Sequence, residues 1–189
     1  MNVFLLQPDL DYKEIDLSPL DIEDIFAENI TLESILDFSK YNMALKEFWS
    51  AIKVDFAGKS EVQHVPDIGI WMDGVLLLSP ATKIFVANVL QPFGEFLPIT
   101  IHAEEWFLFN CTTMASAEVI VDGTIAINLK DNSLNNAPIF KVIVNGKASL
   151  YCTEKFKRLL SDYNIKGIQV KTYNEDLITC TKQPITALS

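Results

Sequence analysis

The sequence predicts an α+β fold, built mainly from a mostly antiparallel sheet of hairpins with a few packed helices. Short runs of β-branched and aromatic residues follow one another directly, separated by the turn dipeptides Asp73-Gly74, Asp122-Gly123 and Asn145-Gly146. The helical segments are few and do not alternate with strands as they would in βαβ units. We expect one continuous domain, with an acidic, partly helical segment over 1–65 and the α+β core over 66–189.

The N-terminal third is predicted to contain two strands and two helical segments. Residues 2–6 are mainly apolar and form the first strand. The pair Ser18-Pro19 is a cap followed by proline, which starts an acidic helix near 19–27. Thr31 opens a second helical segment. Apolar and charged residues alternate over 52–56, which is the period of a half-buried strand.

The middle of the chain is predicted as two hairpins that flank a helix. Residues 66–79 form two short strands around the first Asp-Gly turn. A serine and a proline then start a helix over about 80–90. Residues 96–101 and 106–109 have the strongest strand pattern in the chain, and the polar residues 102–105 are expected to connect them.

The last third is predicted to form another hairpin, a strand, a helix and a closing strand. The hairpin covers 119–127, and the next strand covers 139–144 before its Asn-Gly turn. The clearest helix runs over 153–163, with apolar residues at i, i+3, i+4 and i+7 and Thr153 as its cap. Residues 167–173 form the closing strand.

Charge is distributed unevenly along the chain, whose net charge is −10. Residues 1–39 carry ten acidic side chains against one basic side chain, a net −9. Residues 40–129 carry a net charge of −5, and residues 130–189 carry a net charge of +4. An acidic N-terminal segment repels nucleic acid and anionic lipid, and it accelerates encounter with a basic partner protein.

Composition also indicates where the protein works. No apolar run reaches the roughly 18–20 residues of a membrane span, and the N-terminus has no basic region typical of a signal peptide. The three cysteines are odd in number and have no C-x-x-C spacing, so we expect reduced thiols rather than disulfides or a zinc site. These features favour a cytoplasmic protein.

The sequence offers little catalytic chemistry. The two histidines, His64 and His102, stand in no metal-ligand spacing, and no phosphate-binding glycine loop or nucleophile elbow is present. Cys111 is expected to be a small buried hydrophobe. Glu104 and Glu105 could supply carboxylates to a small hydrolase, but adjacent acids at a hairpin tip more often solubilise the turn. We therefore predict no enzyme activity, no metal and no cofactor.

Several short motifs from residue 66 onward occur in a recognisable order. They are Pro66 to Gly74, the Ser79-Pro80 helix, Gly94 to Pro98, Trp106 to Cys111, Ile139 to Lys141, Leu150 to Phe156 and Lys166 to Ile168. Over 66–170 the chain resembles the bacterial immunity-protein eleven family. It departs from the family pattern at Ser116, near which an acidic residue is expected, and the resemblance does not extend to residues 1–65.

The resemblance implies an immunity protein, which protects a bacterium by binding and occluding a cognate toxin of a polymorphic or secreted (for example type VI) system. Such toxins are often nucleases, whose basic surfaces would attract an acidic inhibitor. The candidate partner-binding residues are the acids of the first helical region and the tryptophan and aspartate of the 71–74 turn: Asp21, Glu23, Asp24, Glu28, Trp71 and Asp73. We expect Trp71 to be an exposed anchor. The alternatives are a carboxylate-dependent hydrolase and a scaffold or adaptor protein.

Overall fold

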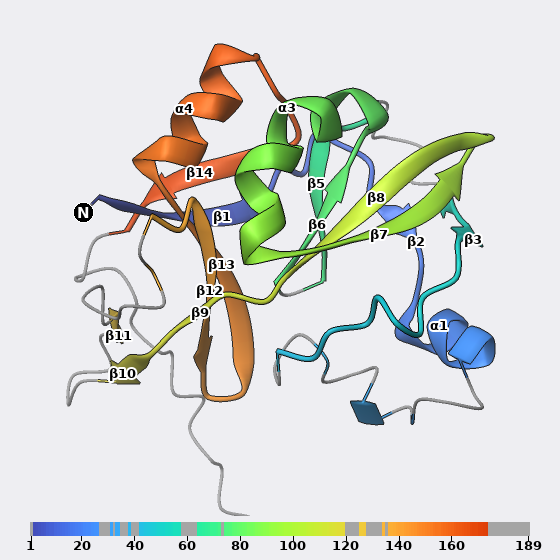
Figure 1. Ribbon diagram of the computed structural model, residues 1–189. Helices are drawn as coiled ribbons and strands as arrows, with labels where there is room; N and C mark the ends of the chain where they lie inside the picture. Colours follow the sequence, from blue (N-terminus) through green and yellow to red (C-terminus); the bar gives the residue numbers. More distant parts are fainter. Residues whose placement is uncertain are drawn as a thin grey trace, which may run out of the picture.

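The computed structural model describes residues 2–26, 31, 33–34, 38, 42–57, 64–72, 74–119, 125–127, 134 and 136–173. Two five-stranded sheets dominate this part of the chain, and helices pack against them (Figure 1). Most strand pairs are antiparallel, so the predicted α+β class is confirmed. No helix among the described residues is long and apolar enough to cross a membrane.

Sheet I joins the two ends of the described chain. Its strand order is β14-β1-β13-β12-β9, and only the β9–β12 pair is parallel. β1 lies between β13 and β14, so the first strand pairs with strands about 150 residues later in the sequence. The strands are β1 (Val3–Pro8), β9 (Met114–Ala115), β12 (Ile139–Val144), β13 (Lys147–Thr153) and β14 (Ile168–Thr172).

Sheet II is built around a long hairpin. Its order is β3-β7-β8-β6-β5, with β3 parallel to β7. The strands are β3 (Ile52–Lys53), β5 (Ile68–Met72), β6 (Val75–Leu78), β7 (Gly94–Ile101) and β8 (Glu104–Cys111). Two small ladders complete the strands, β2 (Ile15–Asp16) with β4 (Asp55–Phe56), and β10 (Ala117–Val119) with β11 (Ile125–Ile127).

The helices begin where the sequence placed them. They are α1 (Pro19–Phe26), α3 (Pro80–Leu90) followed by the 3-10 turn η1 (Gln91–Phe93), and α4 (Glu154–Asp162). Ser79 caps α3, because its hydroxyl accepts a hydrogen bond from the Thr82 amide at 3.2 Å. Thr153 precedes α4 but makes no side-chain cap, because its hydroxyl donates instead to the Pro138 carbonyl at 3.5 Å.

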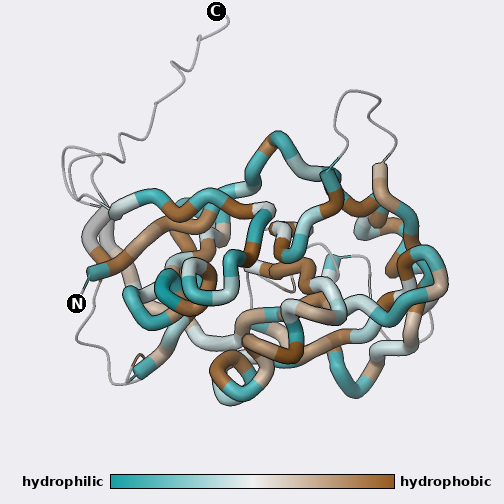
Figure 2. The backbone as a smooth tube through the Cα atoms, turned by 90° about the horizontal axis from the view of Figure 1, so that it is seen from above, coloured by the Kyte–Doolittle hydropathy of each residue, from teal (hydrophilic) through white to brown (hydrophobic). Residues whose placement is uncertain are grey.

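Apolar side chains form three clusters that alternate with the two sheets. One cluster fills the space between the N-terminal segment and the first face of sheet II, where Ile15, Leu17 and Ile22 meet Leu97 and Leu108. The second fills the space among the other face of sheet II, helices α3 and α4, and sheet I. The third covers the outer face of sheet I. Apolar segments accordingly gather in the interior in Figure 2, and polar turns lie outside.

Three local expectations require correction. The β7–β8 turn is two residues long, His102 and Ala103 at φ 50° and 67°, so Glu104 and Glu105 belong to β8 and not to the connection. The strand predicted over 52–56 is two short strands separated by Val54, whose amide donates to the Thr100 carbonyl. The strand that follows the Asn145-Gly146 turn was not predicted as a separate element.

Some predicted elements lie mostly outside the described residues. Thr31 does accept a hydrogen bond from the Ser34 amide at 3.2 Å, as a helix cap would, but the rest of that segment is not described. The Asp122-Gly123 turn is likewise outside. A hairpin is present around it, but β10 ends at Val119, where the predicted strand 119–121 was to begin, and Val119 pairs with Ile125.

Candidate functional site

The acidic candidates of the first helix have different roles. Asp21 closes a capping box, because its carboxylate accepts hydrogen bonds from the Ser18 amide and hydroxyl, both at 2.7 Å. The Ser18 amide is the main reason why the pKa of Asp21 lies below its ordinary value. Glu23 is partly exposed on the same helix. The Asp24 side chain and all of Glu28 lie outside the described residues.

Trp71 is not the exposed anchor that the sequence suggested. Its side chain is partly buried, and its indole N–H donates to the Leu17 carbonyl at 2.8 Å. The ring also stacks on Phe38 with a centroid distance of 6.3 Å. Trp71 therefore holds the N-terminal segment against sheet II. Asp73, its predicted neighbour in a partner interface, lies outside the described residues.

The tertiary structure creates an acidic surface that sequence patterns did not reveal. In the β2–β4 ladder Asp16 lies directly opposite Asp55, and both side chains are exposed. The Asp55 Oδ1 atom is 3.7 Å from His102 Nε2. His102 belongs to the two-residue β7–β8 turn, which leads directly into Glu104 and Glu105. We call Asp16, Asp55, Glu104 and Glu105 the acidic tip. Its members come from three separate parts of the chain, so no local motif could have identified it.

Basic side chains gather at the opposite side of the molecule. Lys155 and Arg158 on α4 are exposed there, while the Lys157 amine lies 4.0 Å from the centre of the Phe4 ring. Figure 1 shows α4 at one side of the molecule, and α1 with the tip of the β7–β8 hairpin at the other. Folding therefore converts the charge gradient along the sequence into a charge separation in space.

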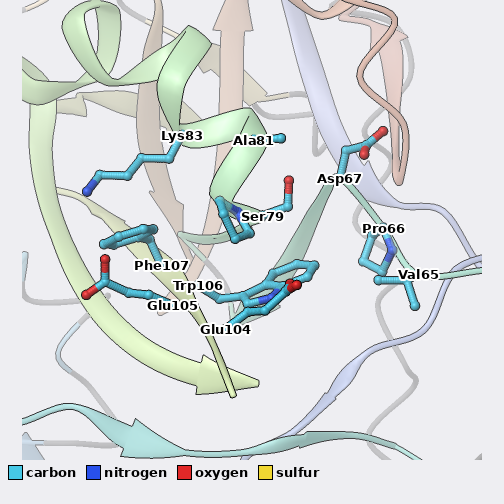
Figure 3. A pocket seen from close by; sticks show the side chains of 11 residues that line it. Val65, Pro66, Asp67, Ser79, Ala81, Lys83, Glu104, Glu105, Trp106 and Phe107 are labelled. Carbon is cyan, nitrogen blue, oxygen red and sulfur yellow. The ribbon is translucent and has the colours of Figure 1, made fainter. Parts of the chain in front are cut away.

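A hollow of about 910 Å³ adjoins the acidic tip (Figure 3). One wall is the beginning of β8, another is the beginning of α3, and the third is the segment that leads into β5. Its lining residues are Val65, Pro66, Asp67, Ser79, Pro80, Ala81, Lys83, Glu104, Glu105, Trp106 and Phe107. Three carboxylates and one amine surround a largely apolar floor. The hollow is wide open to solvent, unlike the enclosed sites typical of small-molecule enzymes.

A partly buried carboxylate network attaches the N-terminal segment to sheet II. Glu95 on β7 accepts hydrogen bonds from the Leu45 amide at 2.6 Å, the Lys46 amide at 3.0 Å and the Asn110 side-chain amide at 2.8 Å. Asn110 is fully buried and also donates to the Met43 carbonyl at 2.9 Å. We call this arrangement the Glu95 clasp. It holds residues 43–46, just before β3, in place.

Two further buried groups lie near the clasp. Lys141 on β12 is fully buried, and desolvation lowers its pKa to about 8 against the opposing attraction of Cys111 and Glu95. Burial raises the pKa of the Cys111 thiol to about 11. Cys111 is therefore a protonated, inaccessible thiol, and its predicted place in the core is confirmed.

The described residues contain no cluster of three or more side chains arranged to hold a metal ion. His102 is an exposed turn histidine, and the Ser79 hydroxyl is committed to its helix cap. No protein-family model and no curated protein matches the chain. The resemblance to the immunity-protein eleven family therefore stays a hypothesis.

Proposed function

We propose that this protein is a binding protein that neutralises a basic toxic partner, as an immunity protein does, rather than an enzyme. The observation that carries the proposal is the acidic tip. Like charges placed directly opposite each other in a ladder destabilise the pair, so Asp16 facing Asp55 opposes folding. A positively charged partner would reduce this repulsion, so binding would favour the complex by a modest amount at these exposed side chains.

The surrounding surface supports the same proposal. Asp11, Glu14 and Asp21 are exposed on the N-terminal segment, and the Glu14 carbonyl accepts a hydrogen bond from the Ala57 amide at the end of the β2–β4 ladder. The basic surface of α4 lies at the far side, where it would not repel a basic partner. Long-range attraction from such a polarised surface raises the association rate and orients the encounter. A toxin whose basic surface contacts phosphate or nucleic acid has the charge that fits.

The direct test is protection. A protein of this kind is expected to be encoded beside its toxin. We would therefore express the product of the gene next to the one that encodes this protein in a bacterial host, with and without this protein, and measure survival and complex formation. Protection together with a stoichiometric complex supports the proposal. Toxicity that this protein does not relieve, or an adjacent product that is not toxic, argues against it.

The acidic surface has its own kinetic test. Asp16→Asn removes half of the repulsive pair, so it should raise stability by about 0.2–1 kcal/mol while it slows association with the partner. Reversing Glu23, Asp24 and Glu28 to lysine, with the capping residue Asp21 left unchanged, should also slow association more than it accelerates dissociation. Increasing salt should have the same effect on the unaltered protein. An association rate that is independent of salt would contradict an electrostatically guided interface.

A further inference from the structure

The hollow beside the acidic tip contains an unpaired strand edge. β6 pairs with β8 only from Phe107 to Asn110, because the chain leaves the sheet at Ser79 to form α3. Among the described residues, Glu104, Glu105 and Trp106 therefore pair with β7 on one side and with no strand on the other. The missing strand position faces the hollow. An edge of this kind is a template for adding an extended segment from another protein.

The two faces of this edge differ in charge. Successive side chains of a strand point to opposite faces, so Glu104 shares one face with Trp106, and Glu105 shares the other with Phe107. Lys83 lies on the Phe107 face, with its amine 3.5 Å from the centre of that ring, and Figure 3 shows it extending towards the Glu105 side. The Phe107 face therefore already contains a cation. The Trp106 face has the exposed Glu104 carboxylate and the edge of an indole that is only 5% exposed and packs against Phe56, but it has no cation among the residues that line the hollow.

We propose that the hollow binds an extended basic segment of the partner protein, which pairs with the outward-facing main chain of Glu105 and places an arginine or lysine side chain at the Glu104 carboxylate, beside the small exposed part of Trp106. This inference rests on the proposed function, because it identifies where and how the basic partner docks. The main chain of the segment would form hydrogen bonds with the strand edge, and the position of its cation would fix which residues of the two strands lie opposite each other. Aromatic faces attract cations, and the Lys83–Phe107 contact is an intramolecular example at the same strand.

The charge of the hollow and the residues of its walls indicate what kind of segment it binds. Asp67, Glu104 and Glu105 outnumber the single Lys83, so a cationic segment complements the hollow and an acidic segment does not. Pro66 and Pro80 on the opposite walls have no N–H to donate, so they do not compete for the carbonyl groups of the incoming strand. The hollow, of about 910 Å³, is open at the surface, so a segment that continues at both ends can enter it.

The test uses a defined peptide, acetyl-Thr-Val-Arg-Val-Thr-amide, and the full-length protein. We would follow the assigned indole N–H signals of its three tryptophans by NMR. The Trp106 signal should shift on titration, whereas those of Trp49 and Trp71, which donate to the Pro98 and Leu17 carbonyls, should not. Replacing arginine by citrulline removes the charge and should weaken binding about tenfold. Methylating the central backbone nitrogens should abolish binding, because they could no longer pair.

The chain provides a matched control in two adjacent exposed glutamates. Glu104→Gln should weaken peptide binding about tenfold, and Glu105→Gln by less than about twofold, because only Glu104 shares the face of Trp106. Both side chains are exposed, so neither substitution should change the unfolding temperature. Equal losses in the two variants, an unmoved Trp106 signal, or binding of spermidine or of the methylated peptide as tight as that of the unmodified peptide would overturn the inference.

The outcome separates this inference from the proposed function. Protection in the host with no peptide binding, and with full protection by the Glu104→Gln variant, would reject the docking mode and leave the neutralising function intact. Peptide binding with the expected variant pattern but without protection would support the docking site and reject the toxin-neutralising role.

Discussion

The Glu95 clasp should determine whether the N-terminal segment stays attached to sheet II. Glu95→Gln keeps the size of the side chain but removes its charge and replaces one acceptor oxygen by a donor NH₂. One carboxylate oxygen accepts from Leu45 and Asn110, and the other accepts from the Lys46 amide. The new NH₂ would therefore face the Lys46 N–H, with which it cannot pair. A hydrogen bond to a charged group contributes about 1.5–3 kcal/mol and one between neutral groups about 0.5–1.5 kcal/mol. We expect a total loss of about 1–3 kcal/mol, because the oxygen bound by Leu45 and Asn110 still accepts and the exposed Lys46 amide can bond to water.

Urea unfolding followed by circular dichroism measures this loss, and amide hydrogen exchange locates it. Faster exchange should be concentrated in residues 42–57, which the clasp holds, while the α4 amides should change only through the global stability. Asp67→Asn is a control that also alters a carboxylate bound to a backbone amide, at 3.0 Å from the Lys166 nitrogen, but at an exposed site. A Glu95→Gln loss below about 0.5 kcal/mol, or unchanged exchange over 42–57, would refute the reasoning.

Three further predictions concern the core. Phe109→Ala should cost about 3–5 kcal/mol in thermal or chemical unfolding, because the ring is fully buried, whereas Ile84→Ala, at an exposed position, should cost almost nothing. Lys141 has a folded-state pKa of about 8, below its ordinary 10.5, so the unfolded chain binds more protons between these pH values. The stability of the unaltered protein should therefore rise relative to Lys141→Met as pH increases from about 8 to about 10.5, and parallel pH profiles would contradict the burial of the amine. Cys111 and Cys152 should react with a disulfide reagent only after unfolding, since both thiols are buried with raised pKa values; rapid labelling of either in the native protein would show otherwise.

Much of the secondary structure could be predicted because it depends on residues close together in the sequence. Ser18 with Asp21 and Ser79 with Thr82 form caps within three residues, and the Asn145-Gly146 turn has the positive φ values that such residues tolerate. The β7–β8 turn was misjudged for the same reason. Its left-handed residues are histidine and alanine, so composition gave no turn signal, and the polar residues that follow resembled a loop.

The functional candidates depended far more on tertiary structure. The sequence identified the acidic N-terminal segment, but it gave Trp71 an exposed position that the Leu17 contact excludes. The acidic tip and the hollow combine residues from β2, β4, β8 and α3, and these strands and helices become neighbours only when the sheets assemble.

By itself, the sequence determined the α+β class, the helix starts, several turns and the polarity of charge from one end to the other, because each depends on composition or on contacts a few residues apart. Only the tertiary structure decided that Asp16 faces Asp55, that Glu95 holds a segment 50 residues away, and that Lys141 is buried. Those features depend on strand pairing between distant segments, and a periodic pattern specifies which face of a strand is buried without specifying its partner.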